Sequence, residues 1–157
     1  MSFKKLLLDT SLLPNDALTF YDDAFYQIVE KIAGLTEAKL LEIQGIRSVY
    51  SFLNTEDVFD ILSMPCSALK DIKKVVCLEA DDHTFIVKPG YRSSIQYLYQ
   101  LLHQKHEQHM KEIAQETKRN IQKHKQKNIN TSIYIHQDPS QTVSTLHTHQ
   151  QSTETSG

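Results

Sequence analysis

The sequence has few of the residues on which most catalytic and cofactor sites depend. Its 157 residues include four glycines, two cysteines and no tryptophan. The glycines are scattered, so no glycine-rich loop is available to hold a nucleotide phosphate. The sequence also lacks a nucleophile elbow and a metalloprotease helix motif. We therefore expect a protein that is not an enzyme, that uses no cofactor and that has no small-molecule substrate.

Long hydrophobic runs are missing as well. The run Leu6–Leu8 stops at Asp9, and no stretch approaches the roughly 20 apolar residues that span a bilayer. We expect an intracellular protein with no membrane partner, in either nucleus or cytoplasm. Cys66 and Cys77 stand among apolar residues without metal or redox spacing, which predicts two buried thiols.

Charge is divided unevenly along the chain. Residues 1–99 carry 10 Lys and Arg against 14 Asp and Glu, a net charge of −4. Residues 100–127 carry 7 against 3, a net charge of +4, within a chain whose total is −2. This asymmetry predicts an anionic partner for the second region only, either nucleic acid or an acidic protein.

Apolar residues at helical spacing predict a first helix from Asn15 to a stop at Gly34. Asn15 or Asp16 is the predicted cap. Its apolar face comprises Leu18, Tyr21, Phe25, Ile28, Val29 and Ile32.

Four shorter helices are predicted next. Their starts are Thr36, Ser48, the acidic pair after Thr55, and Ser67, each a residue type that favours a helix N-terminus. The predicted inward residues are Leu40, Leu41 and Ile43; Val49, Phe52 and Leu53; Val58, Phe59, Ile61 and Leu62; and Leu69, Ile72, Val75 and Val76.

The pattern changes to β-branched and aromatic runs over 76–88. Two such runs flank Asp81-Asp82, which predicts a small hairpin, with a loop and one short strand as the alternative. Asp81, Asp82 and His83 could act as an acid–base cluster, although turn chemistry explains both aspartates equally well. A long helix is predicted from Tyr91, and it lacks Gly and Pro as far as residue 127.

These patterns predict a mainly α fold: a compact bundle of short helices with a small β-hairpin, a long C-terminal helix and a disordered tail. The predicted organisation is an N-terminal extension (1–13), a helical domain (14–104), an extended basic helix (105–127) and a disordered polar tail (128–157). The tail is rich in Ser, Thr, Gln and His, so it cannot bury enough apolar surface to offset its ordering entropy.

The segment Leu41-Glu42-Ile43-Gln44-Gly45-Ile46, between two short helices, resembles the helix-hairpin-helix family, whose hairpin is an apolar–Gly–apolar turn. That resemblance implies a turn whose backbone N–H groups face a DNA phosphate. The family usually has a second glycine two residues after the first, and here that position is Arg47. Arg47 is then a candidate phosphate contact, and the alternative is a plain helix–helix connection.

The segment Gly90-Tyr91-Arg92 opens the long helix and is similar to the end of a sterile-alpha-motif domain. That resemblance implies protein association or RNA binding, although the predicted hairpin does not fit that fold. Residues 15–105 also resemble a segment of uncharacterised animal proteins, which implies no activity.

The basic stretch of the long helix provides the remaining candidate nucleic-acid contacts. With Gly45, Arg47 and Arg92, the predicted binding residues are Lys118, Arg119, Lys123, Lys125 and Lys127. A solvated charged face is the alternative. His103, His106 and His109 recur every three residues, but no cysteine lies near them, so a polar face is favoured over a metal site.

The alternative function is protein association, with the long helix packing on another chain or on a second copy as in a coiled coil. The predicted interface residues are Tyr91, Ile95, Leu98, Leu102, Met110 and Ile113.

Overall fold

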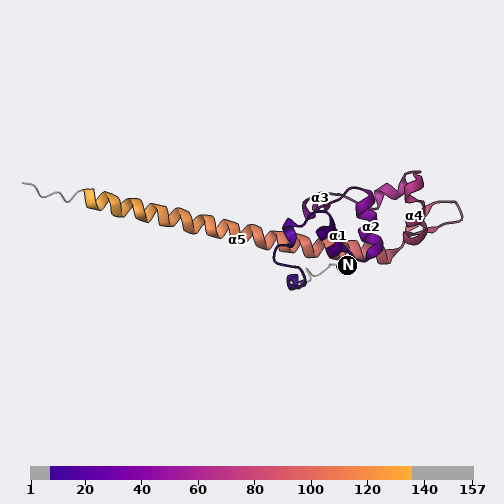
Figure 1. The fold of residues 1–157 in the computed structure, drawn as a ribbon, viewed down its shortest axis with the longest axis horizontal. Coiled ribbons are helices and arrows are strands. Elements are labelled where there is room, and N and C mark those ends of the chain that lie inside the picture. Colours follow the sequence, from indigo (N-terminus) through magenta and orange to yellow (C-terminus); the bar gives the residue numbers. More distant parts are fainter. Residues whose placement is uncertain (1–7, 136–157) are drawn as a thin grey trace, which may run out of the picture. The chain divides into compact units, whose positions relative to one another are not determined.

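A computed structural model describes the backbone of residues 8–135 and the side chains of residues 8–127. This range is mainly helical with one antiparallel two-stranded hairpin, which confirms the predicted fold class (Figure 1). The chain divides between Ala114 and Gln115 into two units, and each is described by itself. None of the described helices is both long and apolar enough to cross a membrane.

Helices α1 (Asp23–Ile32) and α2 (Leu35–Ile43) pack against each other in the first unit (Figure 1). The predicted start of the first helix at Asn15 is wrong, because α1 begins at Asp23. Before it, Ala17–Thr19 forms a single 3-10 turn, and Tyr21 then pairs as an isolated antiparallel bridge with Ser48. This extended pairing interrupts the helical path, so Tyr21 is 55% exposed instead of facing the core.

Gly34 separates α1 from α2 with a φ of +129°, which agrees with the predicted stop. Gly34 also occupies the N-cap position of α2, which the sequence had placed at Thr36. Leu40 and Leu41 are fully buried as predicted, but Ile43 is 47% exposed. At about 100° per residue, Ile43 falls about 60° outside the arc that holds the buried residues of α2.

Helix α3 (Val49–Leu53) begins as predicted, because Ser48 and Ser51 form a reciprocal capping box. The next predicted helix is wrong in type: only a 3-10 helix forms, over Asp60–Ser63. The Asp57 carboxylate accepts a 2.8 Å hydrogen bond from the N–H of Phe59, which holds a local turn where the helix was expected.

Helix α4 (Lys70–Val76) follows a 3-10 turn over Ser67–Leu69, and Cys66 takes the cap position predicted for Ser67. Two predictions of burial are wrong here. Cys66 is exposed, and Val75 is 46% exposed because it lies off the buried face of α4. Cys77 is buried, as predicted, and this burial raises the pKa of its thiol.

The predicted hairpin is confirmed. Strand β1 (Cys77–Glu79) pairs with β2 (Phe85–Val87) so that Leu78 lies opposite Ile86. In the connecting turn, the Asp82 carboxylate accepts bonds from the N–H and the hydroxyl of Thr84, which lower the pKa of Asp82. His83 has a φ of +62°, so Asp82 and His83 serve the turn.

Helix α5 (Pro89–Ile135) begins two positions before the predicted Tyr91, because proline is accommodated in a first helical turn. Its residues 128–135 belong to the segment for which the sequence predicts a disordered tail. The rest of that predicted tail, 136–157, lies outside the described residues. Ahead of the helices, Leu8 and Leu13 are buried in the core, and the backbone of Leu8 bonds the Gln104 amide at 2.8 and 3.3 Å.

Candidate nucleic-acid interface

The Gly45 turn has a structural explanation that requires no phosphate. Gly45 has a φ of +69°, and its N–H bonds the carbonyl of Glu42 at 2.9 Å. The N–H of Ile46 bonds the carbonyl of Leu41 at 3.0 Å, and the Ile46 side chain is buried. These two bonds form the Schellman motif that ends α2, in which glycine avoids the steric cost of the left-handed conformation.

Arg47 follows this turn, but its charge is already paired. Its guanidinium bonds both carboxylate oxygens of Asp22, with Nη2 at 2.7 Å from Oδ2, and this bonding raises the pKa of Arg47. The group also lies 5.0 Å from the ring centroid of Tyr21. A phosphate at Arg47 would therefore compete with a bidentate carboxylate.

Arg92, in the first turns of α5, has a similar environment. Its Nη1 lies 3.0 Å from Oδ2 of Asp57, and its guanidinium carbon lies 5.1 Å from the ring centroid of Phe59. Both candidate arginines of the first unit therefore combine a carboxylate partner with an aromatic neighbour. The sequence predicts that both charges bind a phosphate. In the structure, each guanidinium is instead paired with a carboxylate of the same unit.

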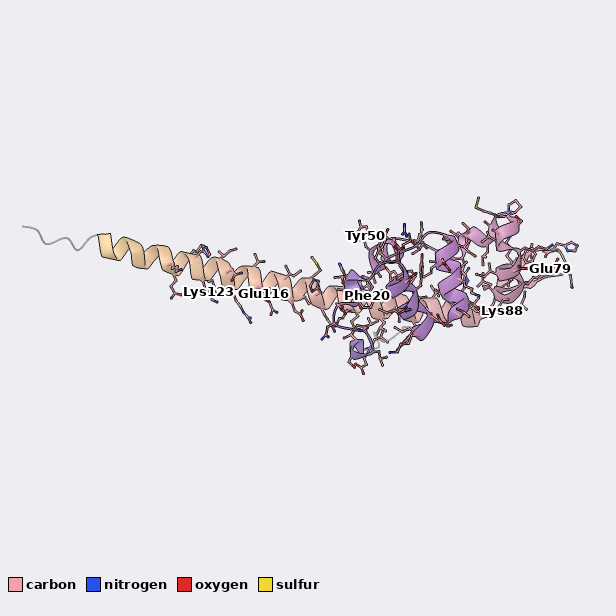
Figure 2. All side chains as sticks on the ribbon, viewed as in Figure 1. Phe20, Tyr50, Glu79, Lys88, Glu116 and Lys123 are labelled. Carbon is pink, nitrogen blue, oxygen red and sulfur yellow. The ribbon has the colours of Figure 1, made fainter. Side chains whose placement is uncertain are left out.

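The five basic candidates of the second unit have a different environment. Lys118, Arg119, Lys123, Lys125 and Lys127 all lie on α5, and every side chain of residues 115–127 is exposed. Figure 2 shows Glu116 and Lys123 projecting from this part of the helix. Arg119, Lys123 and Lys127 recur every four residues and so share one row, whereas Lys118 and Lys125 lie on another face. We call residues 115–127 the basic arm.

The residues predicted to form a protein interface fall into a buried group and an exposed group. Ile95, Leu98 and Leu102 are 8%, 0% and 0% exposed, so they are core residues of the first unit, which corrects their assignment as interface residues. Tyr91 is partly buried against the same core. Met110 and Ile113 remain accessible, at 51% and 43% exposed.

Within the part of the chain that the structure describes, the histidines of α5 are not grouped with other metal ligands. His103 stacks on Tyr99 with a centroid distance of 5.8 Å, and its Nδ1 lies 3.9 Å from the Glu107 carboxylate. Among the side chains that the structure describes, no three His, Cys, Asp or Glu residues are grouped to hold a metal ion.

The described residues thus define a small helical domain with one hairpin and a charged, exposed stretch of α5. No family model matches the chain, and neither curated proteins nor solved structures yield a significant match.

Proposed function

We propose that the chain is a non-enzymatic interaction module that binds nucleic acid through phosphate contacts made by its basic arm. One observation supports this proposal most directly. The basic arm contains five Lys and Arg residues and a single acid, Glu116, and all its side chains are exposed. Such cations bind phosphates largely by releasing counterions from the polymer.

The spacing of the arm favours backbone contact over base recognition. Successive members of the row Arg119, Lys123 and Lys127 rise by about 6 Å along the helix, so the row presents positive charge over about 12 Å. Residues 115–127 contain no Phe, Tyr or Trp side chain on which a base could stack. Binding through this arm is therefore expected to depend on salt and to discriminate little between sequences.

Gly45, Arg47 and Arg92 are not included in this proposed interface. Gly45 closes α2, and each arginine has a carboxylate partner within the first unit. Removing either carboxylate from its arginine would cost interactions that a phosphate has to replace. The proposal is therefore narrower than the sequence-based hypothesis, because it rests on the arm alone.

The test is a titration of the intact chain with labelled duplex DNA, single-stranded DNA and RNA. Binding is expected near 50 mM salt and should weaken steeply towards about 200 mM, because each phosphate contact releases a counterion. A lack of binding to all three polymers at the lower salt concentration would contradict the proposal.

A second candidate function, protein association, is supported by the exposure of Met110 and Ile113. These residues lie three positions apart on one helix face, within the first unit. Another helix could pack on them as in a coiled coil. Light scattering of the intact chain over a wide concentration range tests self-association, and a monomer throughout would contradict a homodimer.

A further inference from the structure

A hollow of about 550 Å³ lies along the outer edge of β2. All of Thr84–Val87 lines it, including Ile86, whose side chain lies on the opposite face from its neighbours, whereas only Cys77 lines it from β1. The 3-10 helix Asp60–Ser63 contributes to the opposite wall. The hollow is therefore bounded by a strand edge and a short helix, with apolar side chains such as Leu62 between them.

The backbone pairing shows which main-chain groups of β2 face this hollow. Ala80 donates to the carbonyl of Thr84 at 2.8 Å, and Lys88 donates to the carbonyl of Val76 at 2.9 Å. Because bonding alternates along an antiparallel strand, the N–H and C=O groups of Phe85 and Val87 point away from β1. No hydrogen bond to another described residue is made by these outward groups. They form an open edge of the kind to which an added strand bonds.

A second hollow, of about 330 Å³, shares two of its lining residues with the first. Phe59 and Arg92 line both hollows, and Arg92 forms an ion pair with Asp57 in the second. The second hollow lies between the 55–59 segment and α5, beside the aromatic ring of Tyr99. We call the two hollows together the β2 groove. It offers an open strand edge at one end and an aromatic pocket at the other.

The rim of the β2 groove is acidic along residues 56–60. Glu56, Asp57 and Asp60 line this part together with Arg92, whereas Nζ of Lys73 lies 5.5 Å from the ring centroid of Phe85 on the strand. His83 also lines the groove, and its Nδ1 bonds the Glu79 carboxylate at 2.9 Å. The fixed charges along residues 56–60 therefore favour a cationic side chain of a ligand over an anionic one at that end of the groove.

We propose that the β2 groove binds an extended peptide segment of a partner protein, added as a third strand at the outer edge of β2. The main-chain groups of Phe85 and Val87 select an extended backbone, and the apolar lining selects apolar side chains at alternate positions. The acidic rim selects Lys or Arg beside them. This site is separate from the basic arm, so it would add a peptide ligand to a phosphate-binding module.

The test is to pan a displayed library of random heptapeptides against the intact chain and to measure the selected synthetic peptides by fluorescence anisotropy. Selected peptides should alternate apolar residues, carry Lys or Arg, and lose binding when the amides of alternate residues are N-methylated. Failure to select any peptide above background, or selection of acidic peptides, would overturn the proposal.

Phe85→Pro is the most specific variant, because it removes an outward N–H and leaves the β1–β2 bonds in place. It should weaken the binding of the selected peptides by about tenfold or more, because one main-chain hydrogen bond is lost and the adjacent bonds are disturbed. Equal binding by a folded Phe85→Pro chain would overturn the strand-addition geometry. Thermal melting establishes that the variant is folded.

Charge reversal keeps the proposal testable if the proline variant does not fold. Asp60→Lys, at an exposed position on the rim, should weaken basic peptides severalfold, and Asp71→Lys on α4, outside the groove, should not. Equal effects of the two reversals would contradict recognition at this groove. A dimer in sedimentation that Phe85→Pro abolishes would instead assign the strand edge to a second copy and overturn the peptide proposal.

Discussion

Two stretches of the same helix, α5, differ in how far their side chains are buried. In the first, Ile95, Leu98, Leu101 and Leu102 are all at most 8% exposed and join the core of the first unit. In the second, the basic arm, every described side chain is exposed, and its one large apolar residue, Ile121, is 51% exposed. The comparison shows where burial ends: the first stretch packs in the core of the domain, whereas the side chains of the second are exposed.

The largest expected effect is on the free energy of unfolding, and it comes from a substitution in the buried stretch of α5. Leu98→Ala removes a fully buried side chain and should lower the free energy of unfolding by about 3 kcal/mol. Ile121→Ala, its matched control in the arm, should change that free energy by less than about 0.5 kcal/mol. Urea denaturation of both variants measures the difference, and equal destabilisation would show that the arm is packed.

A smaller effect is expected from two glycines, one at the end of α2 and one in the first turn of α5. Gly45→Ala places a side chain at a φ of +69° and should lower the free energy of unfolding by about 1–2 kcal/mol. Gly90→Ala has no positive φ and meets no atom within 4 Å, so it should be neutral or stabilise by up to about 1 kcal/mol. Thermal melts compare the two, and a neutral Gly45→Ala would contradict the assigned turn.

A third effect concerns pH and a buried acid in α2. Glu37 is 5% exposed, and burial raises the pKa of its carboxyl above the usual value near 4.5, against smaller opposing hydrogen bonds with its own backbone and with the Ser94 side chain. The folded state therefore holds the proton more tightly than the unfolded state. The contribution of the protonated Glu37 carboxyl to the stability of the folded chain is fully present below about pH 4.5. This contribution is lost as pH rises through the pKa that Glu37 has in the folded state.

Glu37→Gln should remove this loss, so the variant should be more stable than the parent chain at neutral pH. Glu30→Gln, at an exposed position on α1, is the matched control and should leave the pH dependence unchanged. Urea denaturation between about pH 4 and 8 measures both variants. A pH profile that Glu37→Gln leaves unaltered would show that this carboxyl titrates normally in the folded chain.

Local patterns in the sequence were sufficient for the elements whose signals lie within a few residues. The Ser48 cap, the positive φ of Gly34 and the alternation across the hairpin are such signals. The predicted start of the first helix is wrong because the pairing of Tyr21 with Ser48 joins residues that are far apart in the sequence. Tertiary pairing here overrides a helical apolar pattern that local reasoning could not reject.

The candidate site shows the same division. The exposure of the basic arm follows from its lack of apolar residues, which the sequence displays directly. The partners of Arg47 and Arg92 are 25 and 35 residues away, and no local motif points to Asp22 or Asp57. The β2 groove was not predicted either, because its walls come from Asp60–Ser63 and β2, which only tertiary structure brings together.

The central claim is that nucleic-acid binding depends on the charges of the arm and not on positive charge in general. Two triple variants with the same change in net charge test it: Arg119→Gln, Lys123→Gln and Lys125→Gln in the arm, and Lys31→Gln, Lys39→Gln and Lys70→Gln at exposed positions in the domain. The measurement is the slope of log affinity against log salt for duplex DNA. The arm variant should reduce the magnitude of this slope by about 2–3, and the domain variant should reduce it by about 0. Equal slopes for the two variants would contradict the account.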